Sequence, residues 1–126
     1  MARSLVKEKP LFWIGSSKRD FLEFPEAAQD GMGAALSAAQ FGGMHPGAKP
    51  WKGEGPGVFE VVEDCGGDTY RAVYTVRFRS AIYVLHAFQK KSSTGIKTAL
   101  RDVDVVSRRL KAARRDHEER YGKSQK

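Results

Sequence analysis

Basic side chains and one histidine are concentrated between residues 69 and 91, with types and spacing that suit phosphate chemistry. The run Thr69–Phe78 has strand-like composition, so its side chains are expected to alternate between the two faces of a strand. Arg71 falls on one face, and the next predicted strand brings His86, then Lys90 and Lys91. Fixed cations beside a group that exchanges protons near neutral pH suit a phosphodiester. The pattern therefore predicts a site for RNA or DNA.

The charge of the chain points in the same direction. Its 126 residues include 22 Lys and Arg and 15 Asp and Glu, for a net charge of +7 and a pI of about 9.7. Residues 1–63 carry 7 basic and 8 acidic side chains, whereas residues 64–126 carry 15 and 7. This asymmetry favours a polyanionic partner, either nucleic acid or an acidic protein, on the C-terminal half. The alternative is a solvated surface that only aids solubility.

The cysteine and histidine content argues against metal and cofactor chemistry. Cys65 is the only cysteine, so no intrachain disulfide can form, as is typical of the reducing cytoplasm. A thiolate zinc site is excluded, and His45, His86 and His117 are too far apart in sequence to form a ligand motif. The apolar run Leu11–Ile14 is too short for a signal peptide or membrane span. We therefore expect a cytoplasmic protein without metal, cofactor or membrane partner.

Hydrophobic periodicity and turn residues predict seven elements in the order β-α-α-β-β-β-α. They form a single domain over residues 1–126, with a core at about 8–115. Ser17 is the expected N-cap of the first helix, and Pro25 opens the second. Gly and Pro make up about half of residues 42–57, which predicts a long loop without regular structure. The expected strands are 11–14, 58–64, 69–78 and 81–89, and the expected helices are 18–23, 26–40 and 96–121.

This order predicts an α+β fold whose antiparallel sheet has helices on one face, with the other face free to meet a partner. The last helix has one apolar stripe, and its polar end from His117 onward is expected to fray. Its other face is basic and holds Arg101, Arg108, Arg109, Lys111, Arg114 and Arg115.

Four patches, in this order and spacing, resemble the RelE/ParE toxin superfamily in its HigB-like, phage-associated branch. They are the segments 49–52 (KPWK), 57–60 (GVFE), 70–74 (YRAVY) and 84–91 (VLHAFQKK). The resemblance spans about residues 8–115 and implies a RelE-like fold. It implies the toxin of a type II toxin–antitoxin pair, a metal-free endoribonuclease that cleaves messenger RNA on the ribosome and so inhibits translation and growth. The implied partners are messenger RNA, the ribosome and a cognate antitoxin of the helix-turn-helix type.

The superfamily also contains ParE-type members that inhibit DNA gyrase and lack ribonuclease activity, so fold alone leaves that alternative open. A plain nucleic-acid-binding module is a third possibility. The sequence lacks the helix-turn-helix spacing, zinc motif and aromatic strand signature that such modules show.

The resemblance also implies roles for individual residues. Arg71 matches the arginine that contacts the scissile phosphate, and Lys90 and Lys91 match a basic pair at the edge of the active site. His86 matches a recurrent His-x-Phe position, and its chemistry suits a proton shuttle. Tyr121 is the only late tyrosine and lies too far down the last helix to match the C-terminal tyrosine of some RelE members. The expected RNA-binding residues are Lys49 and Lys52 in the loop, Trp51 as a stacking platform, and Arg77 on the strand face of Arg71.

Each of these residues has a structural alternative. Arg71 can pair with Glu60 or Glu63 on the neighbouring strand. His86, expected on the same strand face as Val84 and Phe88, can be a hydrogen-bonded core histidine. The lysine pair can serve as gatekeepers at a strand end. The tryptophan of the loop can plug the edge of the core.

Overall fold

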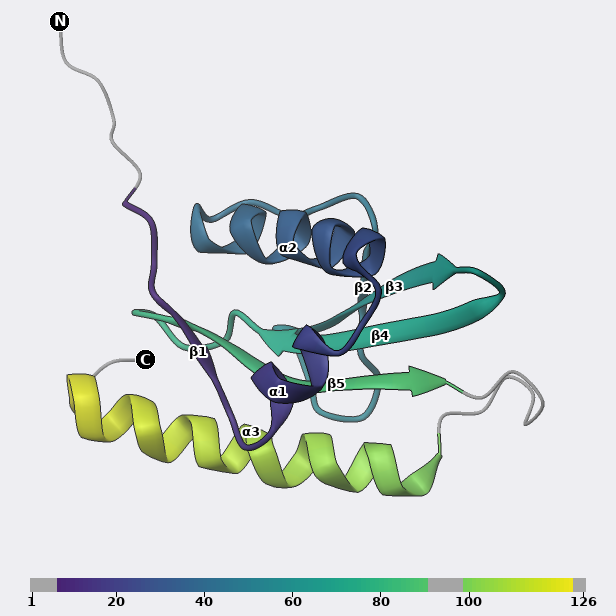
Figure 1. The fold of residues 1–126 in the computed structure, drawn as a ribbon. Coiled ribbons are helices and arrows are strands. Elements are labelled where there is room, and N and C mark those ends of the chain that lie inside the picture. Colours follow the sequence, from purple (N-terminus) through teal and green to yellow (C-terminus); the bar gives the residue numbers. More distant parts are fainter. Residues whose placement is uncertain (1–6, 91–98, 124–126) are drawn as a thin grey trace, which may run out of the picture.

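The computed structural model describes residues 7–90 and 99–123 (Figure 1). Within them the chain forms five strands and three helices, which confirms the mixed α+β class. None of these helices is both long enough and apolar enough to cross a membrane. The elements are β1 (Leu11–Trp13), α1 (Ser17–Leu22), α2 (Glu26–Gln40), β2 (Ala48–Pro50), β3 (Val58–Cys65), β4 (Asp68–Thr75), β5 (Ile82–Lys90) and α3 (Leu100–Tyr121).

The strands form one sheet in the order β1-β5-β4-β3-β2. The predicted antiparallel meander is present as β3-β4-β5, and β1 adds to β5 in parallel. Gly66 and Gly67 join β3 to β4 with φ values of 61° and 88°, beyond the closing pair of Cys65 and Asp68. A two-residue hairpin turn with positive φ at both positions matches the twist of the strands, which is why glycine suits both.

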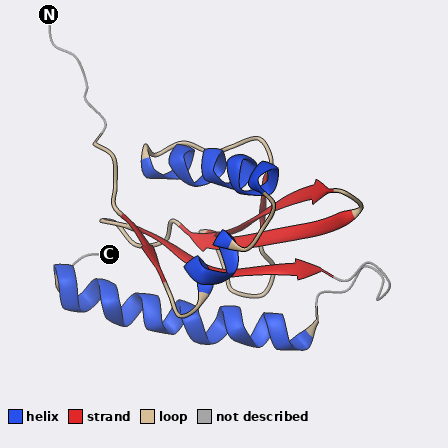
Figure 2. Cartoon of the chain, viewed as in Figure 1, coloured by secondary structure: helices blue, strands red, loops and turns tan. Residues whose placement is uncertain are grey.

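Helices cover both faces of the sheet, so the prediction of helices on one face and a free opposite face is wrong. Helices α1 and α2 lie on one side of the strands and α3 lies on the other (Figures 1 and 2). The apolar stripe of α3, with Val106 and Leu110, packs against Val58, Val73 and Leu85. Since β4 buries side chains on both of its faces, the sheet needs a helical layer on each.

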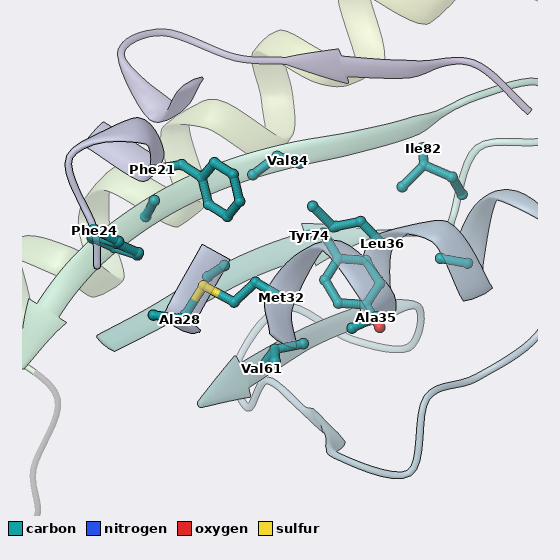
Figure 3. Packing of buried hydrophobic residues seen from close by; sticks show 13 residues of the cluster. Phe21, Phe24, Ala28, Met32, Ala35, Leu36, Val61, Tyr74, Ile82 and Val84 are labelled. Atoms are coloured by element: carbon teal, nitrogen blue, oxygen red, sulfur yellow. The ribbon is translucent and has the colours of Figure 1, made fainter. Parts of the chain in front are cut away.

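The α2 side of the core combines small and large side chains from both the helix and the sheet (Figure 3). Met32 is fully buried and packs in one cluster with Val61, Tyr74 and Ile82. Gly31 lies so close to the Glu63 carboxylate that a Cβ there would collide with it. The helix can approach β3 because that position has no side chain.

Three of the differences between the expected and the observed elements have local causes. Strand β2 lies inside the loop that was expected to be irregular, where Ala48–Pro50 pairs with β3. The predicted strand 69–78 ends at Thr75, whose hydroxyl donates to the Gly57 carbonyl and accepts from the Arg77 amide. Helix α1 begins at Ser17, so its N-cap is Ser16 and not Ser17 as expected; the buried Ser17 side chain donates to the Val84 carbonyl.

The end of α3 does not fray as expected, because the helix continues to Tyr121 and packs on the sheet. His117 is 1% exposed, and its Nε2 accepts a hydrogen bond of 3.1 Å from the Ser80 amide. Its ring stacks on Phe78, and Tyr121 lies 4.8 Å away between ring centroids. The residues after 123 lie outside the described part.

The burial of His117 predicts a pH-dependent stability. Burial lowers the pKa of His117 below its ordinary value of 6.5, although Asp116 and Glu118 oppose the shift. The unfolded chain therefore binds more protons than the native one, and stability falls as the pH drops through 6.5 towards the native pKa. Urea denaturation at pH 7.5 and pH 5.5 should give a lower free energy of unfolding at the acidic pH. The change should shrink in His117→Phe, and an unaltered change would contradict this assignment.

Candidate functional site

Arg71 lies on the face of β4 that meets α3. In the sheet register it stands opposite Val62 of β3 and Phe88 of β5. Its Nη1 donates to Glu60 Oε1 at 2.7 Å, and each of the two side chains is 16% exposed. The ion pair that the sequence offered as an alternative is therefore present with Glu60. Glu63 lies beside Gly31 of α2, so it is on the other face of the sheet.

A β-bulge puts His86 and Val84 on opposite faces of the sheet. Val73 pairs with His86 whereas the next residue, Tyr74, pairs with Val84, so Leu85 is the extra residue of β5. A bulge of one residue reverses the alternation of side chains beyond it. Val84 therefore belongs to the α2 side of the core, and the expectation that it shares a face with His86 is wrong.

His86 forms a buried pair with the first turn of α3. Its Nε2 lies 2.8 Å from Asp102 Oδ1, and its ring stacks on Phe88 at 4.5 Å and an interplanar angle of 20°. Burial, reinforced by Arg109, lowers the pKa of His86 although Asp102 opposes the shift. Nδ1 is buried and has no hydrogen-bond partner among the described residues. Nε2 is engaged by Asp102, Nδ1 is buried, and His86 is not among the residues that line the pocket described below, which favours the core-histidine alternative over the proton shuttle.

Asp102 is the buried partner of His86 that sequence reasoning missed. A signal for it existed, because Asp102 lies on the same helical stripe as Val106 and Leu110, where an acid is out of place. Only 9% of the residue is exposed. A carboxylate on a buried stripe needs a partner, and His86 supplies it.

Arg109 holds the bulge in place and does not belong to the solvated basic face where the sequence placed it. Its guanidinium donates to the Leu85 carbonyl and to Ser16 Oγ, both at 3.1 Å. Burial lowers its pKa. Gly15 runs directly beneath it with φ of 59°, and a Cβ there would lie 2.8 Å from Arg109 Nε.

An open pocket lies beside the Arg71–Glu60 pair. It has a volume of about 280 Å³ and is lined by Pro50, Trp51, Lys52, Glu60 and Val103. Lys49 stands opposite Glu60 in the β2–β3 register and is exposed. The structure thus brings two of the predicted basic loop residues, Lys49 and Lys52, to the carboxylate that holds Arg71.

Trp51 lines this pocket but is only 5% exposed and packs in the α3-side core. Its indole Nε1 is buried without a partner in the described part of the chain. Stacking on a base needs an exposed ring face, so this conformation matches the alternative of a tryptophan that plugs the core edge.

The Arg77 side chain is hydrogen-bonded to the loop before β3. Its Nε and Nη2 donate to the Pro56 carbonyl at 3.1 and 2.9 Å, and Nη2 also donates to the Glu54 carbonyl. Arg77→Ala should therefore destabilise the protein by about 1–2 kcal/mol, because charged hydrogen bonds to these carbonyls are lost. Limited trypsinolysis should cut faster after Lys52. An unchanged digestion rate would show that the arginine does not hold this loop.

The remaining predicted residues are at the end of β5. Lys90 pairs with Thr69 in the β4–β5 register. Lys91 lies outside the described residues. Across the described ranges 7–90 and 99–123, no group of three or more His, Cys, Asp or Glu side chains could hold a metal ion.

A family model described as "Phage derived protein Gp49-like (DUF891)" matches residues 19–111. This range contains the pocket, the Arg71–Glu60 pair and the His86–Asp102 pair. No curated protein and no solved structure matches the chain significantly.

Proposed function

The chain belongs to the Gp49-like family of phage-derived proteins, part of the RelE/Gp49 toxin-like group, and from this premise we propose that it is the toxin of a type II toxin–antitoxin pair. We place it in the HigB-like branch. Its activity is metal-free cleavage of messenger RNA on the ribosome, which stops translation and growth. A helix-turn-helix antitoxin binds and silences it.

One observation carries this proposal: Arg71 is fixed by Glu60, which lines an open pocket together with Lys52. A guanidinium binds a phosphate through two parallel hydrogen bonds and stays charged at any relevant pH. Arg71 would hold the scissile phosphate and stabilise the charge that develops on it. Lys49 and Lys52 would hold the neighbouring backbone, and Lys90 and Lys91 would contact phosphate at the end of β5.

The reaction these side chains suit is attack by the ribose 2′-hydroxyl on the adjacent phosphorus. It leaves a 2′,3′-cyclic phosphate on one fragment and a 5′-hydroxyl on the other. Such a reaction needs no activated water, so fixed cations and a proton acceptor suffice. Arg71 and the nearby lysines would supply the cations, and Glu60 is a carboxylate beside them.

The test is tightly controlled expression in bacteria, followed within minutes by mapping of 5′ ends on abundant messages. We expect discrete new ends inside coding regions, and none with Arg71→Ala. Growth arrest with intact messages and a DNA-damage response would instead identify a gyrase inhibitor of the ParE type and overturn the proposal.

A further inference from the structure

We infer that Glu60 is the general base that takes the proton from the attacking 2′-hydroxyl. This inference rests on the proposed function and names the residue that performs its proton transfer. Its first support is position: Glu60 Oε1 accepts from Arg71 Nη1 at 2.7 Å, and the Glu60 side chain also lines the open pocket. A phosphate bound by Arg71 would therefore lie next to this carboxylate. The 2′-hydroxyl is attached to the same nucleotide as that phosphate.

The second support is that the histidine of the site is already engaged. Nε2 of His86 is bonded to Asp102 at 2.8 Å, and Nδ1 is buried. A general base must come within hydrogen-bond distance of the proton it removes. Glu60 lines the open pocket, whereas His86 is not among its lining residues.

The third support comes from the other carboxylates near Arg71. Asp102 is bonded to His86, and Asp64 accepts from Thr69 near the end of the β3–β4 hairpin. Glu63 faces α2 on the opposite side of the sheet. Among the described residues that line the pocket, Glu60 is the one carboxylate.

The step balances in protons and bonds. The Glu60 carboxylate accepts the 2′-hydroxyl proton as O2′ forms its bond to phosphorus. The bond from phosphorus to O5′ breaks, and O5′ takes a proton from water or a lysine ammonium on the far side of the phosphate. Glu60 then returns its proton to solvent. The arginine and its carboxylate partner thus act on the same phosphodiester, one on the phosphate oxygens and the other on the nucleophile.

The test compares Glu60→Gln with the wild-type chain in cleavage of a messenger on purified translating ribosomes, with kcat and KM measured separately. The amide keeps a hydrogen-bond acceptor for Arg71 but cannot take a proton. We expect kcat to fall by about 100- to 10,000-fold at neutral pH, the typical contribution of a general base. KM should stay within a few-fold of wild type, because Arg71 keeps its acceptor. Glu63→Gln, on the same strand but the opposite face, is the matched control and should keep its activity.

Three results overturn the inference. A Glu60→Gln protein with kcat within a few-fold of wild type shows that another group is the base. A variant whose kcat falls and whose KM rises by a similar factor shows that Glu60 acts only by positioning Arg71. Absence of any cleavage by the wild-type chain removes the proposed function, and with it this role. If Glu60→Gln does not fold, Glu60→Asp decides: the shortened carboxylate should lower kcat with KM within a few-fold of wild type, and a rise of KM alone counts against a base.

Discussion

Arg71→Ala is expected to lower messenger cleavage by about 100- to 1000-fold. The figure follows from the loss of a fixed donor to a developing phosphorane, worth about 2.7–4 kcal/mol in comparable oxyanion sites. Neither Arg109 nor Arg77 is free to replace the guanidinium, because Arg109 is bonded to Leu85 and Ser16 and Arg77 is bonded to the loop before β3. Growth inhibition on induction should be lost together with cleavage.

The measurement is cleavage by purified protein, with thermal unfolding measured in parallel. Some loss of stability is expected, about 1–3 kcal/mol, because Glu60 loses its partner in a partly buried position. Arg115→Ala removes an exposed arginine of α3 and is the matched control, with activity unchanged. Full toxicity of the Arg71 variant would place the active site elsewhere.

His86→Ala is expected to destabilise the fold by about 3–5 kcal/mol while leaving cleavage per folded molecule within a few-fold of wild type. The reason is that Asp102 would remain on the buried stripe of α3 without its partner. The stacking on Phe88 would also be lost. His86→Gln should cost less, since an amide can still donate to the carboxylate.

Urea denaturation gives the free energy of unfolding, and cleavage is normalised to the folded fraction. His45→Ala, in the loop after α2, serves as a control for removal of a histidine that is not in the core. A His86 variant that is as stable as wild type but strongly impaired in cleavage would indicate that His86 is the proton shuttle.

The elements that local chemistry determines were predictable. Pro25 and Gly42 bracket α2 as expected, and the paired glycines after Cys65 mark the β3–β4 hairpin. The features that depend on distant partners were not. Strand β2 is a three-residue segment among glycines and prolines that is ordered only by its pairing with β3. The side of the sheet that α3 covers is a property of packing, which periodicity in one helix does not specify.

The site was predictable in composition but not in arrangement. The alternation of β4 correctly placed Arg71 away from Tyr70 and Tyr74, and Glu60 was one of two candidate partners. The bulge at Leu85 places Val84 on the α2 side of the core, and no local motif indicates it. Alternation alone puts His86 on the face of Arg71 and Phe88, but its burial against Asp102 depends on the packing of α3, which the sequence of one strand does not specify.

The chemical nature of the new 5′ ends tests the central claim most directly. After induction, RNA fragments are ligated to an adaptor that requires a 5′-phosphate, with and without prior treatment with polynucleotide kinase and ATP. Attack by the 2′-hydroxyl at Arg71 predicts ends that ligate only after kinase treatment, because they carry a 5′-hydroxyl. New ends that ligate directly would carry a 5′-phosphate, the product of hydrolysis by water, and would contradict this account.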